Sequence, residues 1–587
     1  MNKDNRHRSI VQSHPQMKPC PRLGFLVNLL FLLVLAGCTT SHYRKSADKE
    51  TYGAIRQKSP LVRNMDTHFN IEQTNVLTLN ALPISTNIHE FLGPDGQRDF
   101  GANVLKLGDA LALAVNYSRS YQARKEQLYL SGLSLTLARH QFAPLFSASG
   151  SANYNVSTEV IEGVEIDPIT QLPTGIVTDN LVEQHQVTGS SDLSASWLIR
   201  DVGRITAALT SDFLRFVTGD SRVTTSSQLT ATFLRPLLRD SGFKQQTEAL
   251  IQAERQLLYD LRDFTQYRKD FSVQVATAYY GVLGNRDAAR NSFLNLQSSR
   301  KNAERSRALA QEGRITQSDL GRLEQQELST ESSWINAVRN YQQASDNFKT
   351  QIGLSVDTKI VLDDRELDAL RIIHPELSVE DSIQIGLAAR LDYLNLKDEL
   401  EDAERKVKLA ANFLLPQVDL TASAALNSDP GDHNGYPHPD PARYSWNAGL
   451  NIDPGLDRKA ERNTYRATLI ARNRASRAIA QQQDDIGLQV RDSWRTLDQA
   501  KRNYEISEIG VKLAERRVEE QDLLADLGRA KAQDQVDAQN ALIDSKNQRT
   551  QALVTHTIAR LQFWNRMGIL YIKDNGQWEE MRHANAK

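Results

Sequence analysis

The sequence predicts a mainly α-helical protein with two strand-rich regions, built from two similar halves. Three observations lead to this prediction. Long stretches without proline, from Phe243 to His374 and from Gly455 to the C-terminus, carry apolar residues at helical spacing. Runs that alternate apolar and polar residues, as β-strands do, interrupt the helical pattern in two regions. The order of these segments occurs twice, which indicates an internal repeat.

The repeat is visible when the chain is shifted along itself by 215 residues without a gap. Under this shift the following pairs coincide: Tyr279 with Trp494, Gly313 with Gly528, Arg314 with Arg529, Asp319 with Asp534, Phe348 with Phe563, and Gly353 with Gly568. Upstream, the shift is 218 residues at Pro236 and Pro454, but 272 at Pro144 and Pro416. The first copy therefore contains 54 extra residues, all between Pro144 and Pro236.

Composition excludes several classes of protein. The 587 residues carry a net charge of −2 with 24% charged residues, so there is no basic field for nucleic acid. A mean hydropathy of −0.49 excludes a helical membrane protein. The sequence has no phosphate-binding glycine loop, no Gly-x-Ser-x-Gly elbow and no His-Glu-x-x-His helix. We therefore expect neither an enzyme nor a cofactor.

The N-terminus has the layout of a secretory signal. An apolar run from Leu23 to Ala36 follows the basic residues Lys18 and Arg22 and ends in Leu-Ala-Gly-Cys at Cys38. This ending resembles the lipobox of bacterial lipoproteins, which implies a signal peptide at 1–37 and an acylated, palmitate-bearing Cys38. The alternative is a plain signal peptide with an incidental cysteine. Because Thr39 is not Asp, the same resemblance implies delivery to the outer membrane of a Gram-negative cell.

The region before the apolar run is long, and Met17 would start a signal peptide of usual proportions. The true start codon is therefore Met1 or Met17. The other cysteine, Cys20, lies in the segment that would be removed, so the mature chain would have no thiol for a disulfide or a metal site. One later loop clusters possible metal ligands, but it is rich in Pro and Gly and we interpret it as a solvated loop without a metal: Asp432, His433, His438 and Asp440.

The β regions differ between the halves. In the first half, alternating runs are expected near 146–156, 187–199, 205–213 and 229–233, with a loop over about 157–183. The second half has two such runs, near 418–426 and 444–452. Strands of about ten residues with one apolar face and aromatic residues near the ends are typical of outer-membrane barrels. A soluble β-sandwich would alternate in the same way, but the signal peptide favours the membrane.

The domain organisation follows from these patterns. We expect a signal peptide at 1–37, an N-terminal tether and strap at 38–106, a first repeat at 107–356 with its β region at about 145–236, a linker at 357–378, a second repeat at 379–570 with its β region at about 416–453, and a tail at 571–587. Residues 107–141 are expected to form one amphipathic helix. After each β region, about 70 helical residues would reach about 100 Å and must pack along apolar seams.

These features together resemble the TolC-like outer-membrane efflux factors, in their lipoprotein-anchored form. The resemblance covers nearly the whole chain from Cys38 and depends on the lipobox, the duplicated helix-strand-strand-helix-helix plan, and the two Gly-Arg turns. It implies a homotrimer in which the protomers share one β-barrel and one long periplasmic α-helical barrel. The extra strands near 187–216 either enlarge that barrel or form a surface hairpin, so the strand count stays open.

The resemblance also implies functional residues. The two turns would form the periplasmic tip where a membrane-fusion adaptor docks, through Gly313, Arg314, Asp319, Gly528 and Arg529. Asp534 and Asp537, three residues apart on one helix face, match the aperture, where six carboxylates of a trimer would favour cations. The alternatives are a solvated acidic face for the two aspartates, and helix C-terminal charges for Arg314 and Arg529.

The function that the resemblance implies is a passive conduit that exports small molecules across the periplasm and outer membrane for an inner-membrane RND or ABC transporter. Two alternatives stay open. The same channel could serve type I protein secretion, or the chain could be a coiled-coil lipoprotein that scaffolds the periplasm without a pore. The sequence names no substrate and no resting state of the tip.

Overall fold

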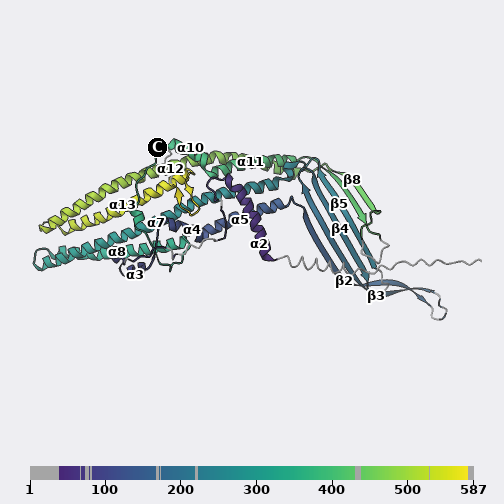
Figure 1. Cartoon of the computed structure of the whole chain (residues 1–587), viewed down its shortest axis with the longest axis horizontal. Helices are drawn as coiled ribbons and strands as arrows, with labels where there is room; N and C mark the ends of the chain where they lie inside the picture. Colours follow the sequence, from purple (N-terminus) through teal and green to yellow (C-terminus); the bar gives the residue numbers. More distant parts are fainter. Residues whose placement is uncertain are drawn as a thin grey trace, which may run out of the picture.

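The computed structural model describes residues 39–579, except 67, 73–78, 80, 81, 87, 167, 168, 170, 172, 219–222, 430–437, 528 and 530. The expected signal peptide, Cys38, Gly528, Asp432 and His433 thus lie outside the described residues. The molecule is elongated: long helical hairpins occupy one end, a tilted β-sheet occupies the other, and shorter helices pack beside the middle (Figure 1).

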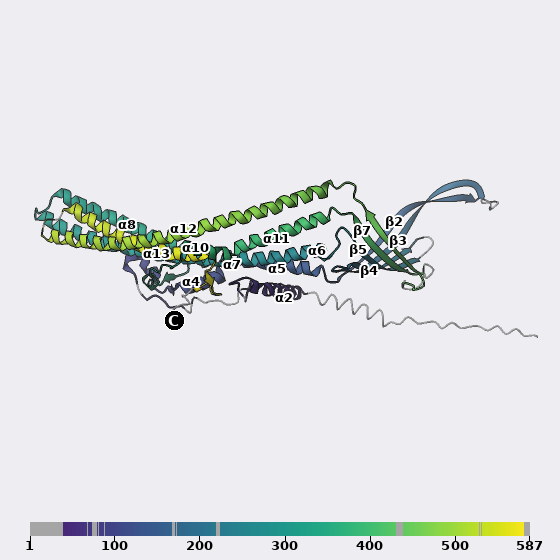
Figure 2. The same cartoon turned by 90° about the horizontal axis from the view of Figure 1, so that it is seen from above.

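The long and medium helices come in two sets of four. The first set is α4 Leu107–Tyr117, α5 Arg119–His140, α7 Glu248–Gln311 and α8 Gln317–Gln351. The second set is α10 Val379–Ala389, α11 Leu391–Asn412, α12 Lys459–Asp526 and α13 Ala532–Arg566. Their lengths are 11, 22, 64 and 35 residues in the first set, and 11, 22, 68 and 35 in the second. In Figure 2, α11 lies between α12 and α7. Among the described residues, none of the helices combines the length and the apolar character needed to cross a membrane.

The expectation of one helix over residues 107–141 is wrong, because the chain turns at Ser118. Its backbone is extended, with φ −64° and ψ 124°, and separates α4 from α5. The apolar spacing continues across this turn, so periodicity does not reveal it. Gly353, which follows α8, packs against the turn with φ +85°, and a Cβ there would overlap the carbonyl oxygen of Tyr117. In the second half, Gly568 packs in the same way against Ala389 and Arg390.

Gly353→Ala is therefore expected to destabilise the protein by about 2 kcal/mol or more, since both the positive φ and the contact with Tyr117 exclude a side chain. Thermal unfolding of the purified variant measures the effect. Gly321→Ala is the matched control, because no atom lies within 4 Å of a Cβ at this helical position. Equal melting temperatures for the two variants would contradict the close approach of Gly353 to the α4–α5 turn.

Six strands form one antiparallel sheet in the order β2-β3-β4-β5-β7-β8. Their bounds are β2 Leu145–Ile166, β3 Pro173–Ile199, β4 Gly203–Phe216, β5 Val223–Pro236, β7 Gln417–Asn427 and β8 Tyr444–Asp453. The strands of the two halves meet where β5 pairs with β7. The outer strands β2 and β8 are not paired with each other, so within the described chain the sheet is open.

The expected loop over residues 157–183 is wrong for most of its length, because β2 and β3 continue through it as a paired ribbon. The ladder runs from Leu145 opposite Ser196 to Val164 opposite Val177 and, after a shift in register, ends with Ile166 opposite Pro173. This ribbon extends past the other strands (Figure 1). The loop interpretation rested on Glu, Gly and Pro, whereas the segment also contains many β-branched residues, which favour strands: Val160, Ile161, Val164, Ile166, Ile176, Val177 and Val182.

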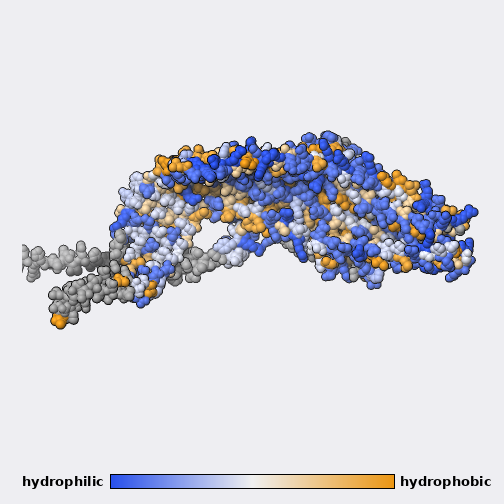
Figure 3. Space-filling model, turned by 180° about the vertical axis from the view of Figure 1, so that it is seen from behind, coloured by the Kyte–Doolittle hydropathy of each residue, from blue (hydrophilic) through white to orange (hydrophobic). Residues whose placement is uncertain are grey.

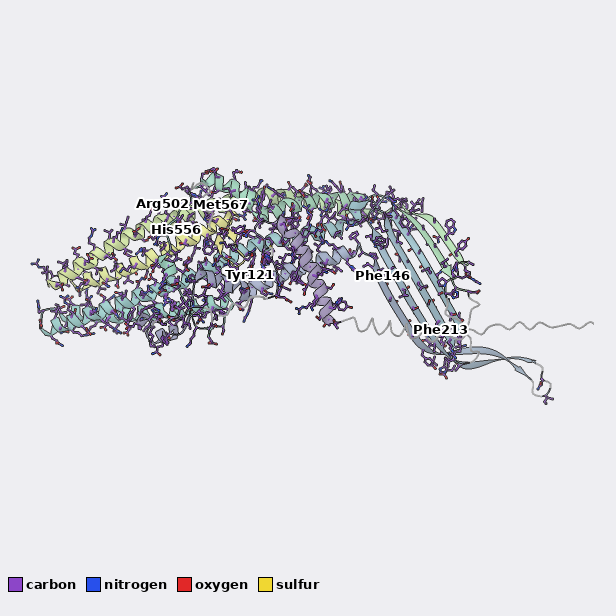
Figure 4. The ribbon with its side chains drawn as sticks, in the orientation of Figure 1. Tyr121, Phe146, Phe213, Arg502, His556 and Met567 are labelled. Carbon is purple, nitrogen blue, oxygen red and sulfur yellow. The ribbon has the colours of Figure 1, made fainter. Side chains whose placement is uncertain are left out.

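The sheet has one apolar face and one polar face. The register aligns apolar residues across all six strands, as in the row in which Leu193 pairs with Leu209 and Leu209 pairs with Leu229. The opposite face carries Ser, Thr, Asn and Gln. Large apolar side chains on the first face are exposed, and these include Phe146 at 81% and Trp446 at 73%. In Figure 4, Phe146 and Phe213 lie toward opposite ends of the sheet, as the aromatic residues of a membrane barrel do.

The N-terminal segment is not a simple tether, contrary to expectation. Residues Thr40–Lys58 form helix α2, which packs against α5 through buried Thr51, Ala54 and Ile55. Asp48 accepts a hydrogen bond of 2.6 Å from the hydroxyl of Tyr129. These small and apolar residues lie three and four positions apart, so α2 buries one narrow stripe, while charged residues such as Arg44 and Arg56 stay exposed.

The segment after α2 crosses the helices as a strap and joins the linker between the halves. Its strand β1, Asn103–Leu105, pairs in parallel with β6, Ile360–Leu362. The remaining short elements are η1 Ser59–Leu61, η3 Glu90–Asp95, α3 Gly96–Asp99, α6 Phe243–Gln246, α9 Arg365–Asp368, β9 Tyr571–Ile572 and β10 Trp578–Glu579. The main hydrophobic core lies where this strap meets α4, α5, α7 and α8.

Candidate functional site

The end of α7 with the start of α8, and the end of α12 with the start of α13, lie at the same end of the molecule, far from the sheet (Figure 1). There the α7–α8 hairpin contacts the α12–α13 hairpin. Arg305 on α7 forms an ion pair of 2.9 Å with Asp526 on α12 and donates a hydrogen bond to the carbonyl oxygen of Ala525. From α8, Arg322 donates a hydrogen bond of 3.3 Å to Gln533 on α13. We call this end of the four helices the tip.

The first turn of the tip has a defined backbone geometry. Gly313 has φ +72°, and its N–H donates to the carbonyl oxygen of Ala310 at 3.0 Å. The N–H of Arg314 donates to the carbonyl oxygen of Leu309 at 2.9 Å. These two bonds are those of a Schellman motif, in which a left-handed residue ends a helix. Glycine at this position therefore fixes the end of α7, whereas Arg314 stays exposed beside Glu312 at 3.8 Å.

The second turn repeats this geometry in the residues that the structure describes. The N–H of Arg529 donates to the carbonyl oxygen of Leu524 at 2.8 Å, as Arg314 does to Leu309. The side chain of Arg529 is exposed. Two exposed guanidinium groups, Arg314 and Arg529, are thus brought to the same end of the molecule. Both are also close to helix C-termini, where a positive charge is favourable.

Asp319 has a local role in starting α8. The hydroxyl of Thr316 accepts a hydrogen bond of 3.1 Å from the N–H of Asp319, and it donates one of 2.7 Å to the carboxylate of Asp319. The first bond caps the N-terminus of α8, and the second links the two side chains. The carboxylate of Asp319 therefore orders the turn. Its matched position in the second half, Asp534, lacks such a partner because Lys531 precedes α13 at the cap position.

The expected aperture residues lie on the first two turns of α13. Asp534 is partly exposed and Asp537 is exposed. Asp537 accepts a hydrogen bond of 2.9 Å from the side-chain amide of Gln533. Within the part of the chain that the structure describes, neither carboxylate forms an ion pair with a Lys, Arg or His. Two uncompensated negative charges thus sit beside each other near the tip, where the start of a helix also favours negative charge.

A row of ion pairs behind the tip was not predicted from the sequence. Arg307 on α7 contacts Glu324 and Glu327 on α8, each at 2.9 Å, and Arg300 contacts Glu331 at 3.0 Å. The sequence pattern that could have predicted these ion pairs is the seven-residue spacing of the arginines on α7, together with glutamates spaced by three and four residues on α8. Because water reaches most of these side chains, each pair stabilises the hairpin only slightly and mainly fixes the register of its helices.

One carboxyl group near the tip has a shifted pKa. Burial raises the pKa of Asp522 on α12, the neighbouring Asp526 raises it further, and Arg305 opposes the rise. The contact of Arg305 with Asp526 therefore reduces the repulsion between two carboxylates at the end of α12.

No described group of side chains at the tip has the geometry of a metal site. In the loop between β7 and β8, Asp440 accepts a hydrogen bond from the N–H of Ala442 and pairs with Arg443 at 3.5 Å. Elsewhere, Asp66, His68 and Asp574 have ligand atoms within 4.8 Å of one another. The guanidinium of Arg268 lies 3.7 Å from the carboxylate of Asp574, so a positively charged side chain already lies beside this group of possible metal ligands.

Comparisons of the chain with known proteins identify its fold. No family model matches the sequence, and no curated protein does. The outer-membrane channel OprN is similar in structure over 85% of this chain and 98% of its own, with 13% identity and a TM-score of 0.54. The Campylobacter jejuni CmeC channel covers 88% and 96%, with 12% identity and a TM-score of 0.57.

The open state of the Neisseria gonorrhoeae MtrE channel covers 86% of this chain and 98% of its own, with 12% identity and a TM-score of 0.55. All three similar proteins are channels rather than enzymes. The chain therefore has the fold of these outer-membrane channels, which is the fold that its resemblance to the TolC-like efflux factors predicts.

Proposed function

We propose that this chain is the channel subunit of a tripartite efflux system in the outer membrane of a Gram-negative bacterium. It is a passive conduit for small molecules, and the energy comes from an inner-membrane RND or ABC transporter. The observation that carries the proposal is the combination of two parts in one chain. A sheet with an exposed apolar face is joined to helices of 64 and 68 residues, which reach about 100 Å.

The sheet requires partners if it lies in a membrane. Six strands are fewer than the eight of the smallest membrane barrels, and an open edge is not tolerated in lipid. A trimer in which each copy contributes its sheet to one barrel meets both conditions. The helices support the same assembly, because α12 exposes a series of large apolar side chains that neighbouring copies would cover: Leu488, Ile506, Ile509, Leu513 and Leu523.

The remaining partners follow from the tip and the N-terminus. The adaptor would dock at the two turns, through Gly313, Arg314, Asp319, Gly528 and Arg529. Acylation of Cys38 would add an anchor in the outer membrane immediately before α2. The exposed charged side chains on the helices are suited to the aqueous periplasm. Figure 3 shows that hydrophilic residues dominate the surface of this part of the molecule.

Asp534→Asn with Asp537→Asn is expected to reduce the cation selectivity of the channel at least about twofold, because six carboxylates around the axis attract cations and repel anions. The two residues lie on one face at the start of α13 and lack a cationic partner among the described residues. The reversal potential of single channels across a salt gradient measures the selectivity.

The matched control removes the same charge from another helix at the same end. Glu519 and Glu520 on α12 are exposed, and their replacement by Gln should leave the reversal potential unchanged. Equal selectivity in the wild type and in the α13 variant would mean that Asp534 and Asp537 form an ordinary solvated acidic face rather than an aperture. The conduit itself would still stand, since conductance does not require a charged aperture.

The same channel could also serve type I protein secretion, and the two functions differ in the transporter and the cargo rather than in this chain. A scaffold without a pore fits less well, because it leaves the exposed apolar face of the sheet without a purpose.

A further inference from the structure

The strands β3 and β4 have no counterpart in the second half of the chain, yet they lie inside the sheet. The second half contributes only β7 and β8, whereas the first contributes four strands. Both β3 and β4 are paired on each side: β3 lies between β2 and β4, and β4 lies between β3 and β5. A hairpin that stands outside a wall would leave β2 beside β5, which is not the observed order.

The faces of these two strands continue the faces of their neighbours. On the apolar face, Trp197 pairs with Ile205, and Ile205 pairs with Phe233 of β5. On the polar face, Asp192 pairs with Thr210, and Thr210 pairs with Gln228 of β5. Trp197 is 44% exposed and Leu193 is 53% exposed, although both are large and apolar. Such side chains fit lipid, and the row of Asp, Thr and Gln fits a water-filled lumen.

The directions of the outer strands permit closure with further copies. Each neighbouring pair in the sheet is antiparallel, so with six strands β2 and β8 run in opposite directions. The free edge of β2 can therefore pair with the free edge of β8 from the next copy, and the antiparallel pattern continues around the ring. An insertion of one strand instead of two would have broken this alternation.

We infer that β3 and β4 are part of the membrane wall, so that three copies of the six-stranded sheet close a pore of 18 strands. This inference rests on the trimeric conduit proposed above. Strands β2, β5, β7 and β8 alone would close 12 strands, and barrel diameter rises roughly linearly with strand number, so the added pair widens the pore about 1.5-fold. The barrel then admits bulky cargo, and the helical tip becomes the part that selects cargo by size.

The first test asks which face of β3 and β4 meets lipid. Single cysteines are introduced at Leu193 and Leu209 on the apolar face, and at Ser194 and Thr210 on the polar face. The sequence has two cysteines, Cys20 in the segment expected to be removed and Cys38 at the expected lipidation site, so the new thiol would be the only free one. The full-length protein is placed in lipid vesicles, with Leu229→Cys and Thr230→Cys on β5 as reference positions.

A membrane-impermeant thiol reagent should label the polar-face positions at least about tenfold faster than the apolar-face positions, and a nitroxide-labelled lipid should quench a probe only at the apolar-face positions. The β5 positions should give the same alternation. Uniform labelling of β3 and β4, together with alternation in β5, would overturn the inference and leave the conduit intact. Uniform labelling of all six positions would overturn the conduit as well.

The second test measures the width of the pore. Tyr154 and Val223 lie in one row of the ladder, through Val187 and Arg215, so their side chains are on the same face of the sheet. Val156, two residues after Tyr154, is on that face too. A two-residue turn that connects Val156 directly to Val223 therefore removes β3 and β4 and keeps both faces of the sheet aligned. A cysteine at Asn447, on the polar face of β8, is exposed to maleimide-polyethylene glycols of increasing size added from outside.

The largest reagent that reacts should be about 1.5-fold wider in diameter for the full chain than for the shortened chain. An equal limit in the two proteins would contradict the widened pore. If the shortened chain fails to assemble, the labelling pattern of the full chain decides the question. Neither measurement depends on export, so the inference can fail while the proposed function stands.

Discussion

Arg286→Leu is expected to lower the free energy of unfolding by about 3–5 kcal/mol, because it leaves a buried carboxylate without its cation. The side chain of Arg286 on α7 is 2% exposed and lies 3.7 Å from Asp99 and 3.4 Å from Asp364. It also donates a hydrogen bond of 3.3 Å to the carbonyl oxygen of Leu362. One cation thus joins the strap, the linker between the halves and the longest helix of the first half.

The loss should depend on pH in a direction that identifies its cause. Burial raises the pKa of Asp99, and Arg286 opposes this rise. Without Arg286 the pKa of Asp99 in the folded state would rise further than it does in the wild type. The folded variant would then bind a proton at a higher pH than the folded wild type, so the deficit of the variant should shrink as the pH falls from 8 to 5. Urea unfolding of the wild type and the variant at both pH values measures this difference.

Arg290→Leu is the matched control, one turn further along α7. Arg290 also contacts Asp364, at 2.6 Å, but its side chain is 40% exposed. Its loss should cost no more than about 1 kcal/mol, because water can solvate the partner. Equal and pH-independent losses in the two variants would mean that Arg286 acts through packing alone, against Phe91 and Tyr341, rather than through its charge.

A second large effect is expected at His556, whose side chain is 0% exposed and whose two ring nitrogens have no hydrogen-bond partner in the described structure. Figure 4 shows His556 on α13. Burial, together with the nearby Arg560, His374 and Lys501, lowers the pKa of His556 to about 4. The ring of His374, in the linker between the halves, has its centroid 6.5 Å away.

The sign of the pH dependence follows from these pKa values. In the unfolded chain His556 takes up a proton near pH 6.5, whereas in the folded protein it stays neutral down to about pH 4. The unfolded state therefore binds more protons as the pH falls through this window, and the protein loses up to about 3 kcal/mol of stability. His556→Phe removes this titration, so the variant should lose less stability than the wild type between pH 7 and pH 4.

Unfolding free energies of both proteins across this pH range measure the difference. His140→Phe provides the control, since His140 is exposed at the end of α5 and its replacement should leave the slope unchanged. Parallel pH profiles for the wild type and the His556 variant would contradict a neutral, buried imidazole.

Periodicity was sufficient to predict the long elements of this fold. Helices such as α7 and α12 span many turns, and the strands near β7 and β8 alternate cleanly, so each pattern is repeated often enough to be distinguished from the other. The turn at Ser118 escaped prediction because the apolar spacing continues across it. The β2–β3 ribbon escaped because its acids, glycines and prolines are also typical of a loop, and only the partner strand decides between the two.

The residues of the candidate site could be predicted from the sequence only in part. The turn at Gly313 was predictable, since glycine next to a helix end has a simple physical meaning and α7 ends at Gln311. The contact of Arg305 with Asp526 was not predictable, because these residues are 221 positions apart in the chain and lie on different helices. The order of β3 and β4 within the sheet was likewise out of reach, because alternation reveals a strand but not its neighbours.

The most direct test of the conduit is to record the purified mature protein in a planar lipid bilayer. The proposed function predicts that the protein is extracted from the outer membrane as a stable trimer that dissociates on heating, and that this trimer inserts and produces repeated conductance steps of uniform size. A monomer that neither inserts nor conducts would contradict the account and would favour a periplasmic scaffold instead.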